Sequence, residues 1–348
     1  MKRMDYNLEC TGCGCRFPSS YRKQTCDGCG RLLEVVYKGS PKVPRSSSFW
    51  DYERLLPKSK YKRYELGGTK LVRSAEHGNL FLKLELTNPT RSFKDRGSVV
   101  EVAKASEYGY DELAVASTGN MAYSLAYYVK MAGMRTTVFI SRAANPDKLR
   151  NILMTHDATL HMVRGGFNKA QELASRYADR NGAFLAGDYC YRKEGQKTIA
   201  YEIAAQLSGV THIIVPVGNA TLISGIAKAM NDMRMKAKLV AVQAERCNPL
   251  VKAIRSRTRL AYQEPMTAAD AIAVGLPTFG MQAIEAISKL GGTAVSISDN
   301  EMIREQAGLY KRQGILAELA GVASLAAFRK LRLKRSDKAV AIISGGNL

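Results

Sequence analysis

The stretch from Asn88 to Gly97 carries a lysine in a setting that favours covalent chemistry. It reads Asn-Pro-Thr-Arg-Ser-Phe-Lys-Asp-Arg-Gly and follows an apolar run that is typical of a strand. Lys94 lies beside an aromatic residue at the expected start of a helix, whose positive end disfavours the ammonium form and lowers the pKa. Such an amine can hold an aldehyde as a Schiff base. The alternative is an ordinary surface lysine.

A strand-turn-helix pattern from Ala116 to Asn120 could bind a small anion. Ser117, Thr118 and Gly119 follow an expected strand and directly precede an expected helix. The hydroxyls, the glycine and the exposed amides of a helix start form a cradle for a carboxylate. Asn120 adds a side-chain amide that could reach a phenolic oxygen. A simple helix cap is the alternative, because serine, threonine and asparagine all serve that purpose.

A second turn of the same kind follows the apolar run 213–217. The turn consists of Gly218, Asn219, Ala220 and Thr221. Its backbone amides, with the threonine hydroxyl, could surround a phosphate monoester at a helix start. A turn with a single glycine is weak evidence by itself. Its position at the carboxyl end of an expected parallel strand is, however, where α/β folds bind ligands.

The last expected strand, 339–343, ends in Ser344 followed by Gly-Gly-Asn. A hydroxyl at that point can share a hydrogen bond with a ring nitrogen without forcing the nitrogen to be protonated, whereas a carboxylate would stabilise the pyridinium form. The alternative is a C-terminal strand that ends in a flexible glycine pair. Ser344 is therefore a candidate contact for a heterocyclic ring.

Five of the seven cysteines fall between positions 10 and 29. Cys10 and Cys13 form one C-x-x-C pair, and Cys26 and Cys29 form another after twelve intervening residues. Two such pairs can place four thiolates around Zn²⁺ at about 2.3 Å per sulfur, and a site closed by four protein ligands is structural. Cys15 could replace Cys13 only with a less regular spacing. A redox pair or a chance pattern is the alternative.

Taken in order, these stretches resemble one family. The succession of Ser-Phe-Lys-Asp-Arg-Gly, Ser-Thr-Gly-Asn, a phosphate turn and Ser-Gly-Gly is similar to the β-family, or fold type II, of pyridoxal-phosphate enzymes. Within that family the chain is most similar to the threonine synthases, from residue 6 to its end. The cysteine-rich start and the stretches 49–57, 65–69 and 194–198 also resemble that subgroup.

The resemblance implies a role for each residue of a cofactor site. Lys94 would be the Schiff-base lysine and the base that moves the Cα proton, and Asn120 would bind the cofactor O3′. The turn 218–221 would hold the phosphate of the cofactor, pyridoxal 5′-phosphate. Ser344 would face the pyridine nitrogen.

The resemblance also implies a substrate site. Ser117, Thr118 and Gly119 would receive the substrate carboxylate. Arg192 lies where the synthases keep an arginine for the phosphate of their substrate. The residues of this substrate site match the family pattern less well than those of the cofactor site, because several positions differ. They are Met121 for a threonine, Ala186-Gly187 for an Asn-Ser pair, Thr221 for a second glycine, and an ending closer to that of threonine and serine dehydratases.

Two activities follow from the resemblance. A threonine synthase would convert O-phospho-L-homoserine and water to L-threonine and phosphate. The alternative is a threonine or serine dehydratase (ammonia-lyase), which gives a 2-oxo acid. A nucleic-acid binder is a third class, suggested by the cysteine pattern and a formal net charge of +21. A single Trp, and motifs explained without a polyanion, argue against it, and we do not expect nucleic acid as a partner.

Short apolar runs alternate with amphipathic stretches along most of the chain. The expected strands are 80–85, 112–116, 136–140, 159–163, 213–217, 239–242 and 339–343. The expected helices include 121–132, 167–181, 196–207 and 321–331. Such alternation indicates parallel sheets covered on both faces. With the resemblance, it predicts an α/β fold of two three-layer αβα domains of the fold type II (tryptophan synthase β-like) kind, with an N-terminal zinc ribbon.

The predicted boundaries divide the 348 residues into three parts. A zinc ribbon would span 1–36, a large cofactor-binding domain would combine 37–85 with 165–348, and a small domain over 86–164 would carry the lysine and the carboxylate loop. Hydrophobic residues at 46% and charged residues at 24% are ordinary for a globular chain. No apolar run suggests a membrane span or a secretory signal. We expect a cytoplasmic homodimer that acts on a small amino acid.

Overall fold

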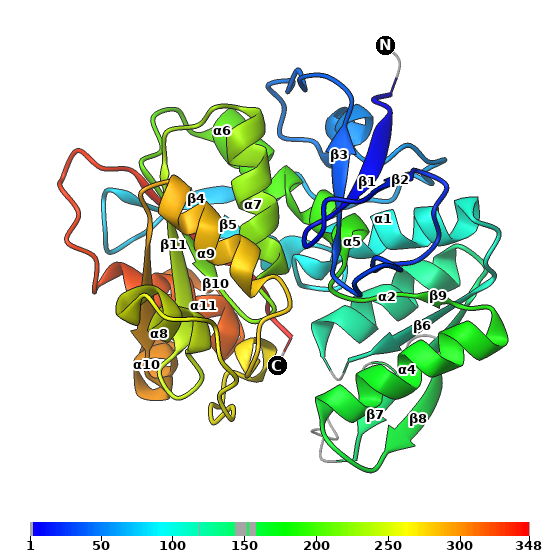
Figure 1. Ribbon diagram of the computed structural model, residues 1–348. Helices are drawn as coiled ribbons and strands as arrows, with labels where there is room; N and C mark the ends of the chain where they lie inside the picture. The colour runs from blue at the N-terminus through cyan, green and yellow to red at the C-terminus, as the bar shows by residue number, and fades with distance from the viewer. Residues whose placement is uncertain (1–2, 118, 143–151, 153–157, 348) are drawn as a thin grey trace. The chain divides into compact units, whose positions relative to one another are not determined.

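The computed structural model describes residues 3–117, 119–142, 152 and 158–347. The chain divides into two compact units, each built from several segments (Figure 1). Unit 1 comprises Met1–Lys42, Tyr52–Glu65 and Lys94–Gly195. Unit 2 comprises Val43–Asp51, Leu66–Phe93 and Gln196–Leu348. The chain therefore passes from unit 2 to unit 1 between Phe93 and Lys94, at the residue that the sequence singles out.

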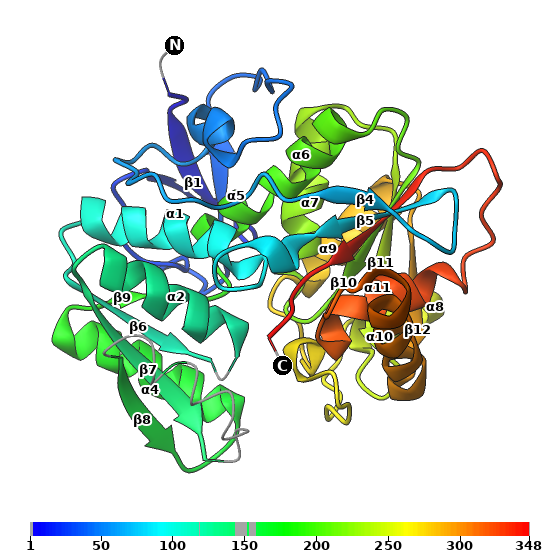
Figure 2. The ribbon, with the colours of Figure 1, turned by 180° about the vertical axis from the view of Figure 1, so that it is seen from behind.

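Unit 1 contains a parallel sheet with helices packed on it (Figure 2). The sheet order is β8 (Thr159–Val163), β7 (Arg135–Ser141), β6 (Glu112–Ala116) and β9 (Phe184–Leu185). The helices are α1 (Lys94–Glu107), α2 (Asn120–Met131), α4 (Phe167–Asn181) and α5 (Cys190–Gln196). Ala170, Ala174 and Ala178 recur every fourth residue on the buried face of α4, which packs on β6 and β7. Every residue of β6 is buried, as expected for a sheet covered on both faces.

A small antiparallel sheet at the N-terminus also belongs to unit 1. Its order is β2 (Arg16–Pro18), β1 (Tyr6–Cys10) and β3 (Leu33–Tyr37). Tyr6, on the buried side of β1, lies 3.4 Å from the Tyr191 hydroxyl of α5. The Tyr108 hydroxyl at the end of α1 donates to the Ser19 carbonyl over 2.7 Å. The sheet is thus packed on the helices of unit 1 instead of standing apart over residues 1–36.

Residues 165–195 also lie elsewhere than the predicted boundary suggests. The sequence assigns them to the large domain, whereas in the structure they complete unit 1. The physical reason is strand pairing between distant parts of the chain, which the spacing of residues in the sequence does not show. Strand β9 pairs with β6 and extends the sheet, and α4 packs on β6, β7 and β9. Both units remain of the predicted α/β kind, with boundaries set by these long-range contacts.

Unit 2 is built on a six-stranded sheet. Its order is β12 (Thr293–Ile297), β11 (Lys238–Ala244), β10 (His212–Pro216), β13 (Ala339–Ile343), β5 (Leu80–Leu84) and β4 (Leu71–Arg73). Only the edge strand β4 is antiparallel to its neighbour. The helices are α6 (Thr198–Gln206), α7 (Thr221–Asp232), α8 (Pro249–Ser256), α9 (Gly280–Lys289), α10 (Asp299–Gln313) and α11 (Leu319–Phe328). Short 3-10 helices lie at Glu85–Thr87 and Asp270–Ile272 of unit 2, and another, Phe49–Leu55, includes residues of both units.

Helix α11 forms the centre of the core of unit 2. Its sequence carries no charge, and its residues from Ala320 to Phe328 are all buried against strands β10 to β13. Gly321 permits a close approach, because an added Cβ would lie 2.4 Å from the Gly345 carbonyl oxygen. The Ser324 hydroxyl donates to the Ile342 carbonyl over 2.6 Å, which fixes the end of β13. No helix in the described part of the chain is long and apolar enough to cross a membrane.

Candidate active site

The segment that leads into Lys94 is fixed by the C-terminal end of the chain. Ser92 pairs with Gly345 in an antiparallel bridge, and the Phe93 amide donates to the Ser344 carbonyl over 3.0 Å. Both contacts lie within unit 2, and Lys94 is the next residue along the chain. The backbone directly before Lys94 is therefore held by the segment that contains Ser344, the candidate contact for a heterocyclic ring.

Further hydrogen bonds extend this pairing in both directions. The Gly346 amide donates to the Arg91 carbonyl over 2.9 Å, and Arg91 Nε donates to the Gly346 carbonyl over 3.1 Å. Asn347 Nδ2 donates to the Thr90 carbonyl over 2.9 Å. Arg91 has a φ of 58°, in the left-handed region that side chains rarely adopt, and the paired segment holds it there. The Gly-Gly-Asn ending is therefore an ordered partner of the lysine segment.

The turn predicted to bind phosphate lies at the same edge of the sheet as Ser344. The turn 218–221 follows β10 and Ser344 follows β13, and these two strands are parallel neighbours. The carboxyl ends of neighbouring parallel strands form the edge at which such sheets bind ligands. Ser344 is buried there. The structure thus brings two of the predicted cofactor contacts together within unit 2.

The backbone of this turn presents a helix start. Ala220 caps α7 with a φ of 63°, and its carbonyl accepts the Ser224 amide over 3.1 Å. An α-helix leaves its first amides without intrahelical partners, and these amides attract anions. Gly218 is confined, since an added Cβ would lie 3.0 Å from the Ala271 carbonyl oxygen. The Asn219 carbonyl accepts the Phe279 amide over 2.9 Å, so the turn is also held by the start of α9.

Unit 1 supplies the residues predicted to hold the substrate carboxylate. Ser117 follows β6 and is buried, and the Gly119 amide lies 3.4 Å from its hydroxyl. Asn120 begins α2, while Thr118 lies outside the described residues. Helices α1 and α2 pack together, and the Ser124 hydroxyl of α2 donates to Asp95 Oδ1 over 2.7 Å. The N-terminal parts of the two helices that begin with Lys94 and Asn120 are therefore joined.

Arg192 has a different environment from the one that the sequence predicts. Its side chain has 0% exposure, and its guanidinium forms an ion pair with Glu101 of α1. Nε donates to the Gly187 carbonyl over 3.0 Å, and Nη1 lies 3.5 Å from the Lys94 carbonyl oxygen. A guanidinium enclosed in this way presents no surface to a substrate phosphate. The structure therefore gives no support to Arg192 as a phosphate ligand and favours a role in positioning α1.

Two glycines allow this enclosure. An added Cβ at Gly97 would lie 2.5 Å from Arg192 Cγ, and one at Gly195 would lie 1.9 Å from the Arg96 carbonyl oxygen. Helices α1 and α5 therefore approach more closely than side chains would permit. Burial raises the pKa of Glu101 to about 7, although the Arg192 charge and the Gly187 amide lower it. The carboxyl is thus close to taking up a proton near neutral pH.

The structure brings together the four cysteines of the two C-x-x-C pairs. The sulfurs of Cys10, Cys13, Cys26 and Cys29 all lie within 4.8 Å of one another. The Gly12 amide donates to the Cys10 sulfur over 3.4 Å, as sharp knuckle turns require. This geometry suits a tetrahedral ion of the zinc type. Cys15 is exposed and lies outside the group.

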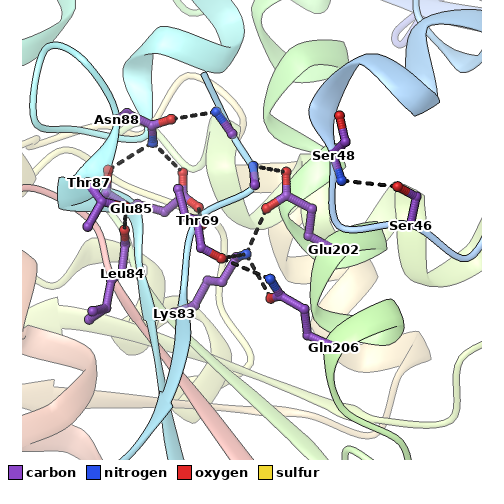
Figure 3. A network of polar contacts seen from close by, with 12 residues as sticks. Ser46, Ser48, Thr69, Lys83, Leu84, Glu85, Thr87, Asn88, Glu202 and Gln206 are labelled. Atoms are coloured by element: carbon purple, nitrogen blue, oxygen red, sulfur yellow. Dashed lines mark hydrogen bonds and ion pairs between the residues drawn. The ribbon is translucent and has the colours of Figure 1, made fainter. Parts of the chain in front are cut away.

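Sequence reasoning missed several buried charges. Lys83 of β5 and Glu202 of α6 form an ion pair of 2.7 Å with no exposed side-chain surface (Figure 3). Glu101 is the corresponding buried carboxylate of unit 1. Each of these residues stands alone as a charge in an otherwise apolar stretch of a strand or helix. That pattern is a usable signal, because a buried charge requires a buried partner.

The fold and these sites define an α/β enzyme of the fold type II class. The structure of maize serine racemase, at a TM-score of 0.73 and 22% identity, covers 80% of this chain and 88% of that one. The family model described as pyridoxal-phosphate dependent enzyme matches residues 62–345. The chain belongs to this family and is a pyridoxal-phosphate dependent enzyme.

Two relatives place the chain more closely within the family. A threonine synthase of Methanosarcina acetivorans is 36% identical over 99% of this chain and 92% of the relative. An L-threonine ammonia-lyase of Thermotoga maritima is 30% identical over 82% of this chain and 71% of the relative. The chain is therefore similar to enzymes with both of the activities that the sequence suggests.

The residues present fit the family's cofactor. Unit 2 offers a helix start for a phosphate and a buried hydroxyl at the same sheet edge, and unit 1 offers a half-buried lysine at the start of α1. In addition, the Ser224 hydroxyl, near the start of α7, is buried without a hydrogen-bond partner among the described residues. Buried polar groups normally have partners, so this hydroxyl is suited to a polar ligand.

Proposed function

We propose that this enzyme is a threonine synthase, which converts O-phospho-L-homoserine and water to L-threonine and phosphate. The observation that carries the proposal is similarity along the whole chain, with 36% identity over 99% of its length to an archaeal threonine synthase. A second threonine synthase, from Methanocaldococcus jannaschii, is 34% identical over 97% of the chain. Residues from the cysteine cluster to the last strand therefore take part in the similarity.

In this proposal, named residues hold the cofactor. Lys94 would hold its aldehyde, Asn120 would bind its phenolic oxygen, the turn 218–221 would bind its phosphate and Ser344 would face its ring nitrogen. When bound, pyridoxal 5′-phosphate supplies an electron sink that stabilises negative charge at the substrate carbon atoms. A serine hydroxyl at the nitrogen suits this role without requiring a charged ring.

The other proposed residues act on the substrate. Ser117, Thr118 and Gly119 bind the carboxylate, which fixes the orientation of Cα. Once the substrate amino group has replaced Lys94 at the cofactor aldehyde, the released Lys94 amine would remove the Cα proton as a general base and return a proton later in the reaction. Its place at the first residue of α1 supports this double use, because the rigid helix restricts where the amine can reach.

A second candidate is a threonine or serine ammonia-lyase, which gives a 2-oxo acid. The environment of Arg192 favours the ammonia-lyase. Its guanidinium, which the sequence predicts to bind a substrate phosphate, is buried and forms an ion pair with Glu101 instead. Ala186 and Gly187 also lack the polar side chains that synthases place nearby. Similarity to the ammonia-lyase extends over 82% of the chain.

We also propose that the four-cysteine group binds one structural Zn²⁺. Four thiolates leave no open position for substrate, and the sulfur separations fit a single tetrahedral ion. Metal bound there would join β1 to the loop that precedes β3. Elemental analysis of protein purified without chelators tests this, and a content well below one zinc per chain would contradict it.

One assay separates the two enzyme candidates. Purified protein is incubated with phosphohomoserine and, separately, with threonine, and phosphate and 2-oxobutanoate are measured in each reaction. The proposal predicts release of phosphate together with threonine, and little 2-oxobutanoate. Production of 2-oxobutanoate without phosphate turnover would replace the synthase with the ammonia-lyase. A Lys94→Ala protein is the matched control and should be inactive in both reactions.

A further inference from the structure

A buried polar network in unit 2 lies directly before the lysine segment (Figure 3). We call it the Asn88 network. Its members are Gly67, Gly68, Thr69, Lys83, Glu85, Asn88, Glu202 and Gln206. The side chains of Lys83, Glu85 and Glu202 have no exposure, and those of Thr69 and Asn88 have almost none. Nothing in the proposed chemistry uses these charges directly.

One end of the network is the ammonium group of Lys83. It donates to the Thr69 carbonyl over 2.7 Å, to Glu202 Oε2 over 2.7 Å and to Gln206 Oε1 over 2.9 Å. An ammonium group has three donors, so all of them are used. The second oxygen of Glu202 accepts the Gly68 amide over 2.9 Å. The ion pair therefore fixes the turn at positions 67–69.

The other end of the network is Asn88. Its Oδ1 accepts the Gly67 amide over 2.9 Å, and its Nδ2 donates to the Glu85 carbonyl over 2.8 Å and to Glu85 Oε2 over 3.0 Å. Thr69 Oγ1 donates to the other Glu85 oxygen over 2.7 Å and closes the circuit. These hydrogen bonds thus fix the turn at 67–69 relative to Asn88, the first residue of the segment that leads to Lys94.

The chain from Asn88 to Lys94 is short and tied at both ends. The Asn88 carbonyl accepts the Arg91 amide over 2.8 Å, and the Phe93 amide reaches the Ser344 carbonyl. Between these points the backbone includes a proline and the left-handed Arg91. The backbone of residues 89–93 therefore has little conformational freedom. If Asn88 moves, we expect Lys94 to move with it.

We propose that the Asn88 network is a positioning device that sets the place of the Lys94 amine. A buried ion pair is a poor source of stability compared with apolar packing, so its presence in the core needs another reason. A closed circuit of directional hydrogen bonds defines one geometry, whereas apolar contacts tolerate small shifts. Asn88 and Glu202 act through the segment 88–93 and do not touch the reacting atoms.

The test compares Asn88→Ala with Thr211→Ala. Thr211 is a matched control, because its hydroxyl bridges two backbone segments of unit 2 by accepting the Lys338 amide over 3.0 Å. It precedes β10 and so lies at the opposite edge of the sheet from Ser344. The measurements on the holoenzyme are kcat, KM and amide hydrogen exchange of the peptide 89–95, with Tm recorded for both variants.

We expect Asn88→Ala to lower kcat by about 10- to 100-fold with KM changed less than about threefold, since small misplacements of a reacting group are costly. Exchange at 89–95 should rise while exchange elsewhere in unit 2 stays near that of the wild type. Thr211→Ala should leave both readouts unchanged. Equal kcat losses in the two variants, or exchange that rises evenly across unit 2, would overturn the proposal.

A second variant guards against loss of folding. Thr69→Val keeps the shape of the side chain and the Lys83–Glu202 ion pair, and it removes only the hydroxyl that donates to Glu85 Oε1, so it should fold and show a smaller loss of kcat in the same direction. A wild-type kcat in this variant with unchanged exchange at 89–95 would also overturn the proposal. The kinetic measurements rest on the proposed function, whereas the exchange measurement does not. If the wild type uses neither substrate, the proposed function fails and the exchange result still decides the role of the network.

Discussion

Two fully buried ion pairs flank Lys94 in the sequence, one in each unit, and they differ in their cation and in the segments that they join. In unit 2, Lys83 and Glu202 have partners for every ammonium proton and both carboxylate oxygens. In unit 1, Arg192 and Glu101 are equally buried and both Glu101 oxygens also accept hydrogen bonds, and desolvation raises the pKa of Glu101 to about 7. The difference shows that burial alone does not define the role of a pair.

The segments that the pairs join account for the contrast. The pair of unit 2 holds the turn at 67–69 through Gly68 and Thr69, and Asn88 holds the same turn through Gly67. The pair of unit 2 is therefore suited to fixing a geometry. The pair of unit 1 joins α1 to α5 and remains sensitive to pH. The changes below at Lys83, Arg192 and Glu101 should each affect one pair and leave the other intact.

The largest expected effect comes from Lys83→Met. Removing the cation leaves the Glu202 carboxylate buried without its charge partner, which should lower the free energy of unfolding by about 3–5 kcal/mol. Urea unfolding followed by circular dichroism measures the loss. Adding Glu202→Gln to the same chain should restore at least half of it, because the uncompensated charge is then gone. A double variant as unstable as Lys83→Met would contradict this reading of the pair.

Next in size is the effect of Cys10→Ser on unit 1. The variant should lose the zinc that we propose for the four-cysteine group, and metal binding contributes to the folding of the structure around it. The small sheet contacts α5 directly, since Tyr37 donates to Glu194 over 2.6 Å and Lys193 pairs with Glu34. We therefore expect hydrogen exchange to rise in α5 as well as in the sheet. Exchange confined to residues 1–36 would show that the sheet is independent after all.

A smaller effect is expected from Arg192→Lys. A lysine cannot reproduce the contacts of the planar guanidinium to Gly187 and Glu101, so activity should fall by about tenfold. Because Arg192 is enclosed, the loss should be the same for phosphohomoserine and for threonine. Steady-state kinetics with both substrates measure the ratio. A loss restricted to phosphohomoserine would restore Arg192 as a phosphate ligand and contradict the structural interpretation.

The smallest effect is a change in the pH dependence of stability. The folded pKa of Glu101, about 7, lies above its ordinary value of 4.5, so the folded state holds this proton more tightly than the unfolded state. The contribution to stability is complete below pH 4.5 and is lost as pH rises through about 7. Glu101→Gln should remove that slope in urea unfolding across this range. An identical slope in the variant would assign the titration to another group.

The sequence was sufficient where the chemistry is local. The positions of Lys94, Asn120 and Ser344 at the ends of strands and starts of helices follow from short apolar runs and their turns, and the structure confirms these placements. The four cysteines were also predictable, because knuckle spacing places their sulfurs with little help from the rest of the chain.

The sequence was insufficient where distant segments decide. Whether Arg192 faces solvent or Glu101 depends on the close packing of α1 and α5 at Gly97 and Gly195, which neither local stretch reveals. The unit boundary has the same cause, since β9 extends the sheet beside β6 from seventy positions further along the chain. Lone charges in apolar stretches, such as Lys83, are the clue that could have located such contacts in advance.

The central claim, that Lys94 carries the cofactor, has a direct test. The holoenzyme is reduced with borohydride, digested and analysed by mass spectrometry for a lysine bearing the reduced cofactor. The account predicts the label on the peptide that contains Lys94, and no stable label in Lys94→Ala. Labelling of another lysine in the wild type, or an unchanged label in the variant, would contradict it.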